Sequence, residues 1–134
     1  LLATHASSSF LVSNGASGGI VIAWDRSCLS LFSSNHTPYS LTTTLQSNFS
    51  SLILTVTNYY GPCSHCDKQA FLDDLIELQS SLSGAWVVLG DFNLIRSPDD
   101  RSNGNFNHQE AGWFNDAIEA MDLQELPLLD QRFT

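Results

Sequence analysis

The sequence predicts an α/β fold, and three observations lead to this prediction. Apolar and polar residues alternate with a period of two along 39–46 and again along 51–59, which is typical of β-strands. The period then changes to about 3.6 over 71–82, which is typical of an amphipathic helix. A short apolar run at 86–89 has the length and β-branched content of a buried strand. Strand, helix and strand in succession form a βαβ unit, so we expect the strands on either side of the helix to be parallel.

The part of the chain before residue 60 predicts an antiparallel meander with short loops. Shorter strands are expected at 10–12, 20–24 and 28–32. The run 20–24 is apolar on both faces, which predicts a central strand covered from both sides. Cys28 lies within an apolar run, and we therefore expect it in the core.

The part after residue 93 predicts a polar loop and a second helix. The loop covers 94–108, and its charged cluster at 99–101 is either a solvated surface or a contact with a substrate. An amphipathic helix is expected over about 109–121, with an apolar face that turns inward. Residues 128–134 are typical of the beginning of a further strand.

The composition restricts the classes of function. A chain of 134 residues is one domain or part of one. The net charge of -9, with five basic residues, argues against a nucleic-acid clamp, which needs clustered Lys and Arg. It is compatible with a nuclease, because a divalent cation can carry the positive charge to the phosphate. No apolar run is long enough to span a membrane, and the N-terminus, without Lys, Arg or an initiator Met, is typical of a chain entered part way.

The three cysteines predict neither a disulfide framework nor a zinc site. Cys63 and Cys66 form a C-x-x-C pair with His65 inside it. A structural zinc ion needs about four ligands, and no second pair of Cys or His follows. We therefore expect an ordinary pair of loop thiols in a reducing compartment.

The candidate functional site lies where the apolar run 86–89 ends. Asp91 and Asn93 are spaced by two, so in an extended chain their side chains point to one face and Phe92 points into the core. Open α/β sheets place their chemistry at such carboxyl ends. A carboxylate can take a proton from water or bind a hard cation, and an amide can hold a water or a phosphate oxygen. Alternatively, 90–93 is only a turn, since Gly, Asp and Asn are common turn formers.

Parallel strands bring further residues to the same edge of the sheet. If the strand before the helix runs parallel to the strand after it, Asn58 and Tyr60 lie at the same edge as Asp91 and Asn93. Alternatively, Tyr60 is an aromatic residue at a strand end that packs on the core.

Two motifs in this order resemble the endonuclease/exonuclease/phosphatase superfamily. They are Asn-Tyr-Tyr-Gly-Pro at 58–62 and, about 30 residues later, Gly-Asp-Phe-Asn at 90–93. Gly-Gly at 18–19, Trp-Asp at 24–25 and Arg-Phe-Thr at 132–134 resemble in particular the endonuclease domain of plant LINE-type (non-LTR) retrotransposons. The resemblance covers nearly the whole chain, and it implies that residues 1–134 are the central part of a four-layer α/β sandwich.

The resemblance also implies an activity and roles for three residues. The family hydrolyses phosphodiesters with Mg²⁺ or Mn²⁺, and the full-length retrotransposon enzyme nicks DNA, which implies an intracellular, nuclear location. By this resemblance, Asp91 matches the metal ligand that orients or deprotonates the attacking water. Asn93 matches the residue that contacts the phosphate or positions the aspartate. Tyr60 matches the tyrosine that donates a hydrogen bond towards the developing charge on phosphorus.

Several residues of the family pattern are absent from this sequence. The family has an Asn and a Glu ligand before the Gly-Gly segment, whereas the first Glu here is Glu77. It also ends in an Asp-His pair, whereas the only His after Asp91 is His108. Cys63 stands where many members have Asn. We therefore expect a fragment that holds metal weakly if at all, is nearly inactive alone, and has exposed sheet edges that can pair with another chain.

Two alternatives follow from these departures. The chain is a non-catalytic, degenerate remnant with a binding or structural role, or it belongs to a phosphatase of the same superfamily that acts on small phosphoesters or lipids. No residue in the sequence identifies the substrate.

Overall fold

The computed structural model describes residues 6–11, 19–100 and 104–127. The chain forms two compact units, which are treated separately below. The sheet unit comprises Leu1–Tyr60 and Leu82–Asp91, and the helical unit comprises Gly61–Ser81 and Phe92–Thr134. The expected strand at 128–134 lies outside the described residues.

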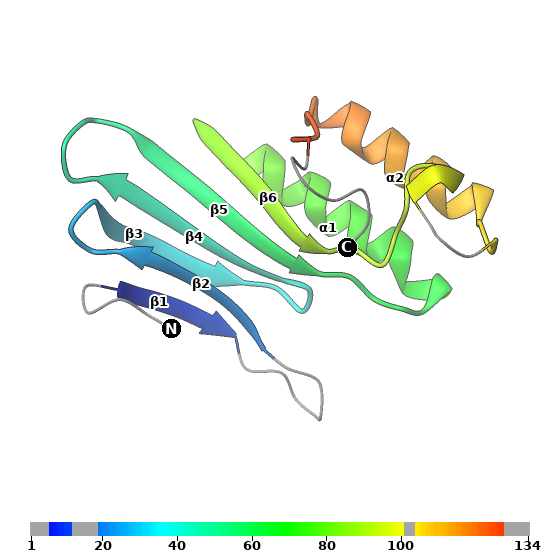
Figure 1. Cartoon of the computed structure of the whole chain (residues 1–134), viewed down its shortest axis with the longest axis horizontal. Coiled ribbons are helices and arrows are strands. Elements are labelled where there is room, and N and C mark those ends of the chain that lie inside the picture. Colours follow the sequence, from blue (N-terminus) through cyan, green and yellow to red (C-terminus); the bar gives the residue numbers. More distant parts are fainter. Residues whose placement is uncertain (1–5, 12–18, 101–103, 128–134) are drawn as a thin grey trace. The chain divides into compact units, whose positions relative to one another are not determined.

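The sheet unit contains a two-stranded and a four-stranded sheet (Figure 1). The first is an antiparallel pair of β1 (Ala6–Leu11) and β2 (Ile20–Asp25). The second has the order β3-β4-β5-β6, with bounds Leu29–His36, Ser40–Ser47, Ile53–Tyr60 and Ala85–Asp91. Neighbours from β3 to β5 are antiparallel, and β6 is parallel to β5. The parallel pair predicted from the βαβ pattern is therefore confirmed.

The predicted continuous meander is wrong at one point, because β2 and β3 belong to different sheets. The turn between them explains the break. The Asp25 carboxylate accepts hydrogen bonds from the backbone N–H and the hydroxyl of Ser27, at 2.8 and 2.7 Å. The backbone N–H of Cys28 then donates to the carbonyl of Asp25. Such a side-chain turn redirects the chain, and it leaves Cys28 exposed rather than in the core as predicted.

The core of the sheet unit lies between its two sheets. Ile22 and Trp24 of β2 are buried together with Leu41 and Leu45 of β4. The intervening residues of β2 are exposed, so this strand packs on one face only and the prediction of a strand covered on both sides is wrong. The outward-facing residues Val21 and Ala23 are themselves apolar, and for this reason the sequence 20–24 is apolar on both faces of the strand.

The opposite face of the four-stranded sheet carries paired threonines. The hydroxyls of Thr42 and Thr57 lie 3.0 Å apart across the β4–β5 pair, and those of Thr44 and Thr55 lie 3.1 Å apart. The indole N–H of Trp86 on β6 donates to the Thr57 hydroxyl at 2.9 Å. Satisfied hydroxyls can be buried at little cost. This explains why β4, predicted to be half-buried, is buried on both faces.

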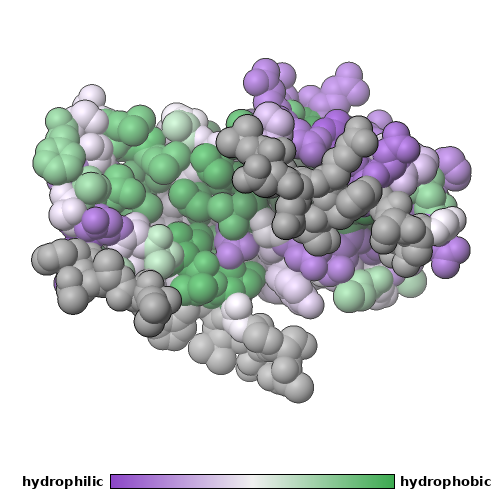
Figure 2. Space-filling model, in the orientation of Figure 1, coloured by the Kyte–Doolittle hydropathy of each residue, from purple (hydrophilic) through white to green (hydrophobic). Residues whose placement is uncertain are grey.

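Apolar surface remains exposed on the sheet unit, and Figure 2 shows apolar colouring over its strands. On β6 the exposed apolar residues are Val87 and Leu89, whose register partners are Val56 and Asn58. They share a face with the buried Leu41 and Leu45, because directly paired residues project to the same side of a sheet. On this face, side chains of β2 cover the residues of β4, whereas the apolar residues of β6 are exposed to solvent.

The helical unit contains the two predicted helices. α1 covers Lys68–Ser81 and follows the short η1 at His65–Asp67, and α2 covers His108–Ala120 and follows η2 at Pro98–Asp100. The ring of Phe92 lies 6.2 Å from that of Phe71 and 5.3 Å from that of Phe114, which confirms that Phe92 packs inward. None of the helices in the described parts of the chain is both long and apolar enough to span a bilayer.

Two glycines allow close approach of backbones at the motif positions. Gly90 has a φ of 129°, and a Cβ there would overlap the main-chain carbonyl oxygen of Tyr59 on the paired strand. A Cβ at Gly61 would overlap the carbonyl oxygen of Phe92 within the helical unit. Side chains are therefore excluded at both positions, whatever their chemistry.

Replacing Gly90 tests this packing. We expect Gly90→Ala to destabilise the protein by about 1–3 kcal/mol or more, because it combines a backbone conformation unfavourable for alanine with the overlap on Tyr59. Urea unfolding followed by circular dichroism measures the change. Gly112→Ala is the matched control, since Gly112 lies in α2 with open space around it, and it should stabilise by about 0.5–1 kcal/mol.

A Gly90→Ala variant as stable as the wild type would show that the ends of β5 and β6 are not in close contact.

Candidate functional site

The structure places Tyr60 directly opposite Asp91. In the parallel β5–β6 pair, Tyr59 is the partner of Gly90 and Tyr60 is the partner of Asp91. Paired residues of adjacent strands project to the same side of the sheet, so the phenol and the carboxylate share one face at the carboxyl ends of both strands. Tyr60 is 53% exposed, which excludes the alternative that its ring packs in the core. An acid and a phenol are thus both accessible at one rim of the sheet unit.

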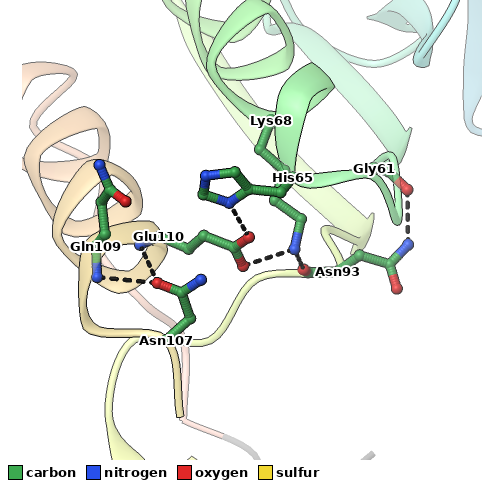
Figure 3. A network of polar contacts seen from close by, with 7 residues as sticks. All are labelled: Gly61, His65, Lys68, Asn93, Asn107, Gln109 and Glu110. Atoms are coloured by element: carbon green, nitrogen blue, oxygen red, sulfur yellow. Dashed lines mark hydrogen bonds and ion pairs between the residues drawn. The ribbon is translucent and has the colours of Figure 1, made fainter.

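Asn93 does not share this face by extension of the strand, as the sequence spacing predicted. β6 ends at Asp91, and Asn93 adopts the left-handed conformation with a φ of 50°. Asparagine tolerates this conformation better than most residues. Because Gly90 and Asp91 belong to β6, the alternative that 90–93 is only a turn is wrong, and the chain leaves the strand after Asp91. Its side-chain amide donates to the carbonyl oxygen of Gly61 at 2.6 Å (Figure 3).

Asn58 has a structural contact. Its side-chain amide donates to the main-chain carbonyl of Val21 on β2 at 3.2 Å. This hydrogen bond links the two sheets of the sheet unit. Asn58 projects from the same face of the sheet as Tyr60 and Asp91, two positions earlier in the register, and its amide is used there in the contact with β2.

A polar network in the helical unit was not identified from the sequence (Figure 3). The ammonium of Lys68 donates to the Glu110 carboxylate at 2.7 Å and to the Asn93 carbonyl at 2.9 Å. The second oxygen of Glu110 lies 2.6 Å from Nδ1 of His65. We call Gly61, His65, Lys68, Asn93 and Glu110 the lysine network. One signal was visible in advance: Lys68 is the only lysine in the sequence.

Lys68 and Glu110 of the lysine network are largely shielded from water, whereas the His65 side chain is half exposed. Lys68 is 6% exposed, and the side chain of Glu110 is 15% exposed. Burial alone raises the pKa of Glu110, but the hydrogen bonds from Lys68 and His65 and their charges outweigh it, so the pKa lies below the ordinary 4.5. The amide oxygen of Asn107 caps α2 by accepting from the N–H groups of Gln109 and Glu110 at 3.1 Å.

The residues that the structure describes do not form a complete site for a metal ion. Across residues 6–11, 19–100 and 104–127, no three His, Cys, Asp or Glu side chains gather closely enough to hold one. At the rim of β5 and β6, Asp91 supplies the one carboxylate that the register places there. Hard cations such as Mg²⁺ take six or more oxygen ligands, of which waters can supply several. Cys63 and Cys66 are exposed free thiols.

The acidic loop cluster lies on the surface. Asp99 and Asp100 are exposed in η2, and the Asp100 carboxylate accepts from the backbone N–H of Ser97 at 2.9 Å. Arg101 lies outside the described residues. These contacts agree with a solvated surface that stabilises its own turn.

Comparisons with known proteins show the fold. No family model matches the chain, and no curated protein matches it. Among the solved structures, the catalytic domain of human nocturnin, determined with a bound sulfate anion, matches with a TM-score of 0.50 and 16% identity. The match covers 70% of this chain and 44% of that domain, so the chain spans less than half of its length. The chain thus has a mixed α/β fold that matches part of a fold of the endonuclease/exonuclease/phosphatase type.

The lowered pKa of Glu110 predicts acid destabilisation of the protein. Because the carboxylate is favoured in the folded state, its contribution is fully present above pH 4.5 and is lost as the pH falls through the lower folded pKa. We expect Glu110→Gln to cost about 1–3 kcal/mol near pH 7, and the difference from the wild type to shrink at acid pH. Thermal unfolding between pH 3 and pH 7 measures this.

Glu119→Gln is the control, since Glu119 is exposed on the same helix and should change stability little at any pH. A cost for Glu110→Gln that stayed constant at acid pH would contradict the ionic role of Glu110.

Proposed function

We propose that this chain is part of a metal-dependent phosphodiesterase, and more narrowly of the DNA endonuclease of a LINE-type retrotransposon. The observation that carries the proposal is the register of β5 and β6, which sets the Tyr60 phenol opposite the Asp91 carboxylate at the carboxyl ends of parallel strands. Hydrolysis of a phosphodiester needs a base for water and a donor for the charge that develops on phosphorus. These two side chains supply both kinds of group.

The proposed roles follow from the chemistry of each side chain. Asp91 accepts the proton of the attacking water, or holds that water in line with the bond to be broken. Tyr60 donates its phenolic hydrogen to a phosphate oxygen, an interaction that strengthens as negative charge accumulates. Asn93 holds the Gly61 carbonyl, so we assign it a positioning role and not a contact with phosphate.

One further observation supports a phosphodiester substrate, and the net charge is compatible with it. The nocturnin domain with a similar fold was determined with a bound sulfate, a tetrahedral anion like phosphate. The net charge of -9 makes unaided binding of DNA unfavourable, which agrees with a reaction in which a divalent cation neutralises the phosphate. The narrower assignment to a retrotransposon enzyme rests on the sequence motifs Gly-Gly at 18–19, Trp-Asp at 24–25 and Arg-Phe-Thr at 132–134.

Mg²⁺ or Mn²⁺ would be held through Asp91 in this proposal. A single carboxylate binds such an ion weakly, so the other oxygen ligands would come from outside the described residues or from water. When bound, the ion would supply positive charge at the phosphate.

A second candidate is a non-catalytic remnant. It is favoured by the single carboxylate at the rim and by the absence of a metal-binding group among the residues that the structure describes. Metal binding at Asp91 separates the two candidates, since an inert remnant has no reason to retain it.

A titration with Mn²⁺ followed by NMR tests the proposal. We expect paramagnetic broadening centred on Asp91 and Tyr60, with a dissociation constant on the order of 1 mM or weaker because one carboxylate supplies the protein ligand. Asp91→Asn should abolish the localised broadening. Asp73→Asn, which removes an exposed carboxylate of α1, is the control and should leave it intact.

Broadening spread over the acidic surface, with no preference for Asp91, would favour the remnant. Nicking of supercoiled plasmid DNA by this chain with Mg²⁺ is expected to stay near background. Strong nicking that Asp91→Ala removes and Tyr60→Phe lowers about 10²-fold would establish an enzyme and contradict the single-carboxylate limit.

A further inference from the structure

The lysine network joins three separate stretches of the helical unit at one ammonium group. Lys68 is the first residue of α1, Glu110 lies in the first turn of α2, and Asn93 belongs to the loop after β6 (Figure 3). A lysine ammonium has three hydrogens to donate. Two of them have identified acceptors here, the Glu110 carboxylate and the Asn93 main-chain carbonyl.

Glu110 is fixed on both of its oxygens. One accepts from Lys68, and the other lies 2.6 Å from Nδ1 of His65. The His65 ring lies 5.2 Å from the Trp113 ring, which is one turn further along α2. Glu110 therefore has little freedom to rotate away, and it holds the Lys68 ammonium in one place.

Asn93 is fixed on both its main chain and its side chain. The Lys68 ammonium donates to the main-chain carbonyl of Asn93 at 2.9 Å. The side-chain amide of Asn93 donates to the carbonyl of Gly61 at 2.6 Å. The left-handed conformation costs a non-glycine residue of order 1 kcal/mol and persists only where its surroundings impose it. The two hydrogen bonds of Asn93 impose this conformation.

We propose that Lys68, oriented by Glu110, is a positioning residue that holds Asn93 in the left-handed conformation and so fixes the backbone directly after Asp91. The consequence for Asp91 rests on the proposed function, whereas the conformation of Asn93 does not. The only lysine of an acidic chain is thus used inside the protein, on a backbone carbonyl, and not on its surface for binding an anion.

A double variant distinguishes two possible roles of Lys68, namely a partner in an ion pair that only stabilises the fold and a residue that positions Asn93. Lys68→Met alone leaves Glu110 charged and largely buried, which destabilises the protein for reasons unrelated to Asn93. Lys68→Met combined with Glu110→Gln removes both charges, so the melting temperature should return towards the wild-type value. The donor to the Asn93 carbonyl stays absent in both variants.

NMR of the double variant is the test. We expect the three-bond HN–Hα coupling constant of Asn93 to change, and the hydrogen-exchange protection of the Asn93 and Leu94 amides to fall about tenfold or more. Mn²⁺ should bind about tenfold more weakly at Asp91, since loss of groups that orient a ligand lowers metal affinity by 10–100-fold. Gln69→Met, at the exposed neighbouring position of α1, is the control and should change none of these.

An unchanged coupling constant and unchanged protection at Asn93 in the double variant would overturn the proposal. If Mn²⁺ fails to bind the wild type at Asp91, the proposed function fails, but the coupling constant still decides the role of Lys68.

Discussion

The parallel contact between the ends of β5 and β6 is the constraint on which the candidate site depends. Gly90 lies against the carbonyl of Tyr59 without room for a Cβ, and the next pair in register is Tyr60 and Asp91. A side chain at residue 90 would separate the strands next to the point where Tyr60 and Asp91 pair in register. The glycine of the Gly-Asp-Phe-Asn motif is therefore a packing requirement of the β5–β6 pair.

The elements that depend on local periodicity could be predicted from the sequence. The alternating strands, both helices and the parallel β5–β6 pair follow from patterns of apolar residues and from the handedness of βαβ connections. The inward position of Phe92 followed from its parity relative to Asp91. The predicted rim of the sheet also formed, with Tyr60 and Asp91 as register partners.

The features that the sequence did not predict depend on contacts between distant residues or on a single turn. An Asp25–Ser27 turn separates β2 from β3, and it leaves Cys28 exposed although Cys28 was predicted to lie in the core. Asn93 was expected to continue the strand, whereas a left-handed turn forms and is held by Lys68, 25 positions earlier. A pattern of apolar and polar residues carries no information about a hydrogen bond between residues so far apart in the sequence. In addition, a lysine at the start of a helix is most often exposed to solvent.

The shared rim of Tyr60 and Asp91 is tested most directly by cross-strand nuclear Overhauser effects in the wild-type chain. The parallel register predicts backbone contacts that pair Tyr59 with Gly90 and Tyr60 with Asp91, and that continue to the pair of Leu54 and Ala85. Contacts in a register shifted by one residue would place the phenol and the carboxylate on opposite faces of the sheet and contradict the proposed site.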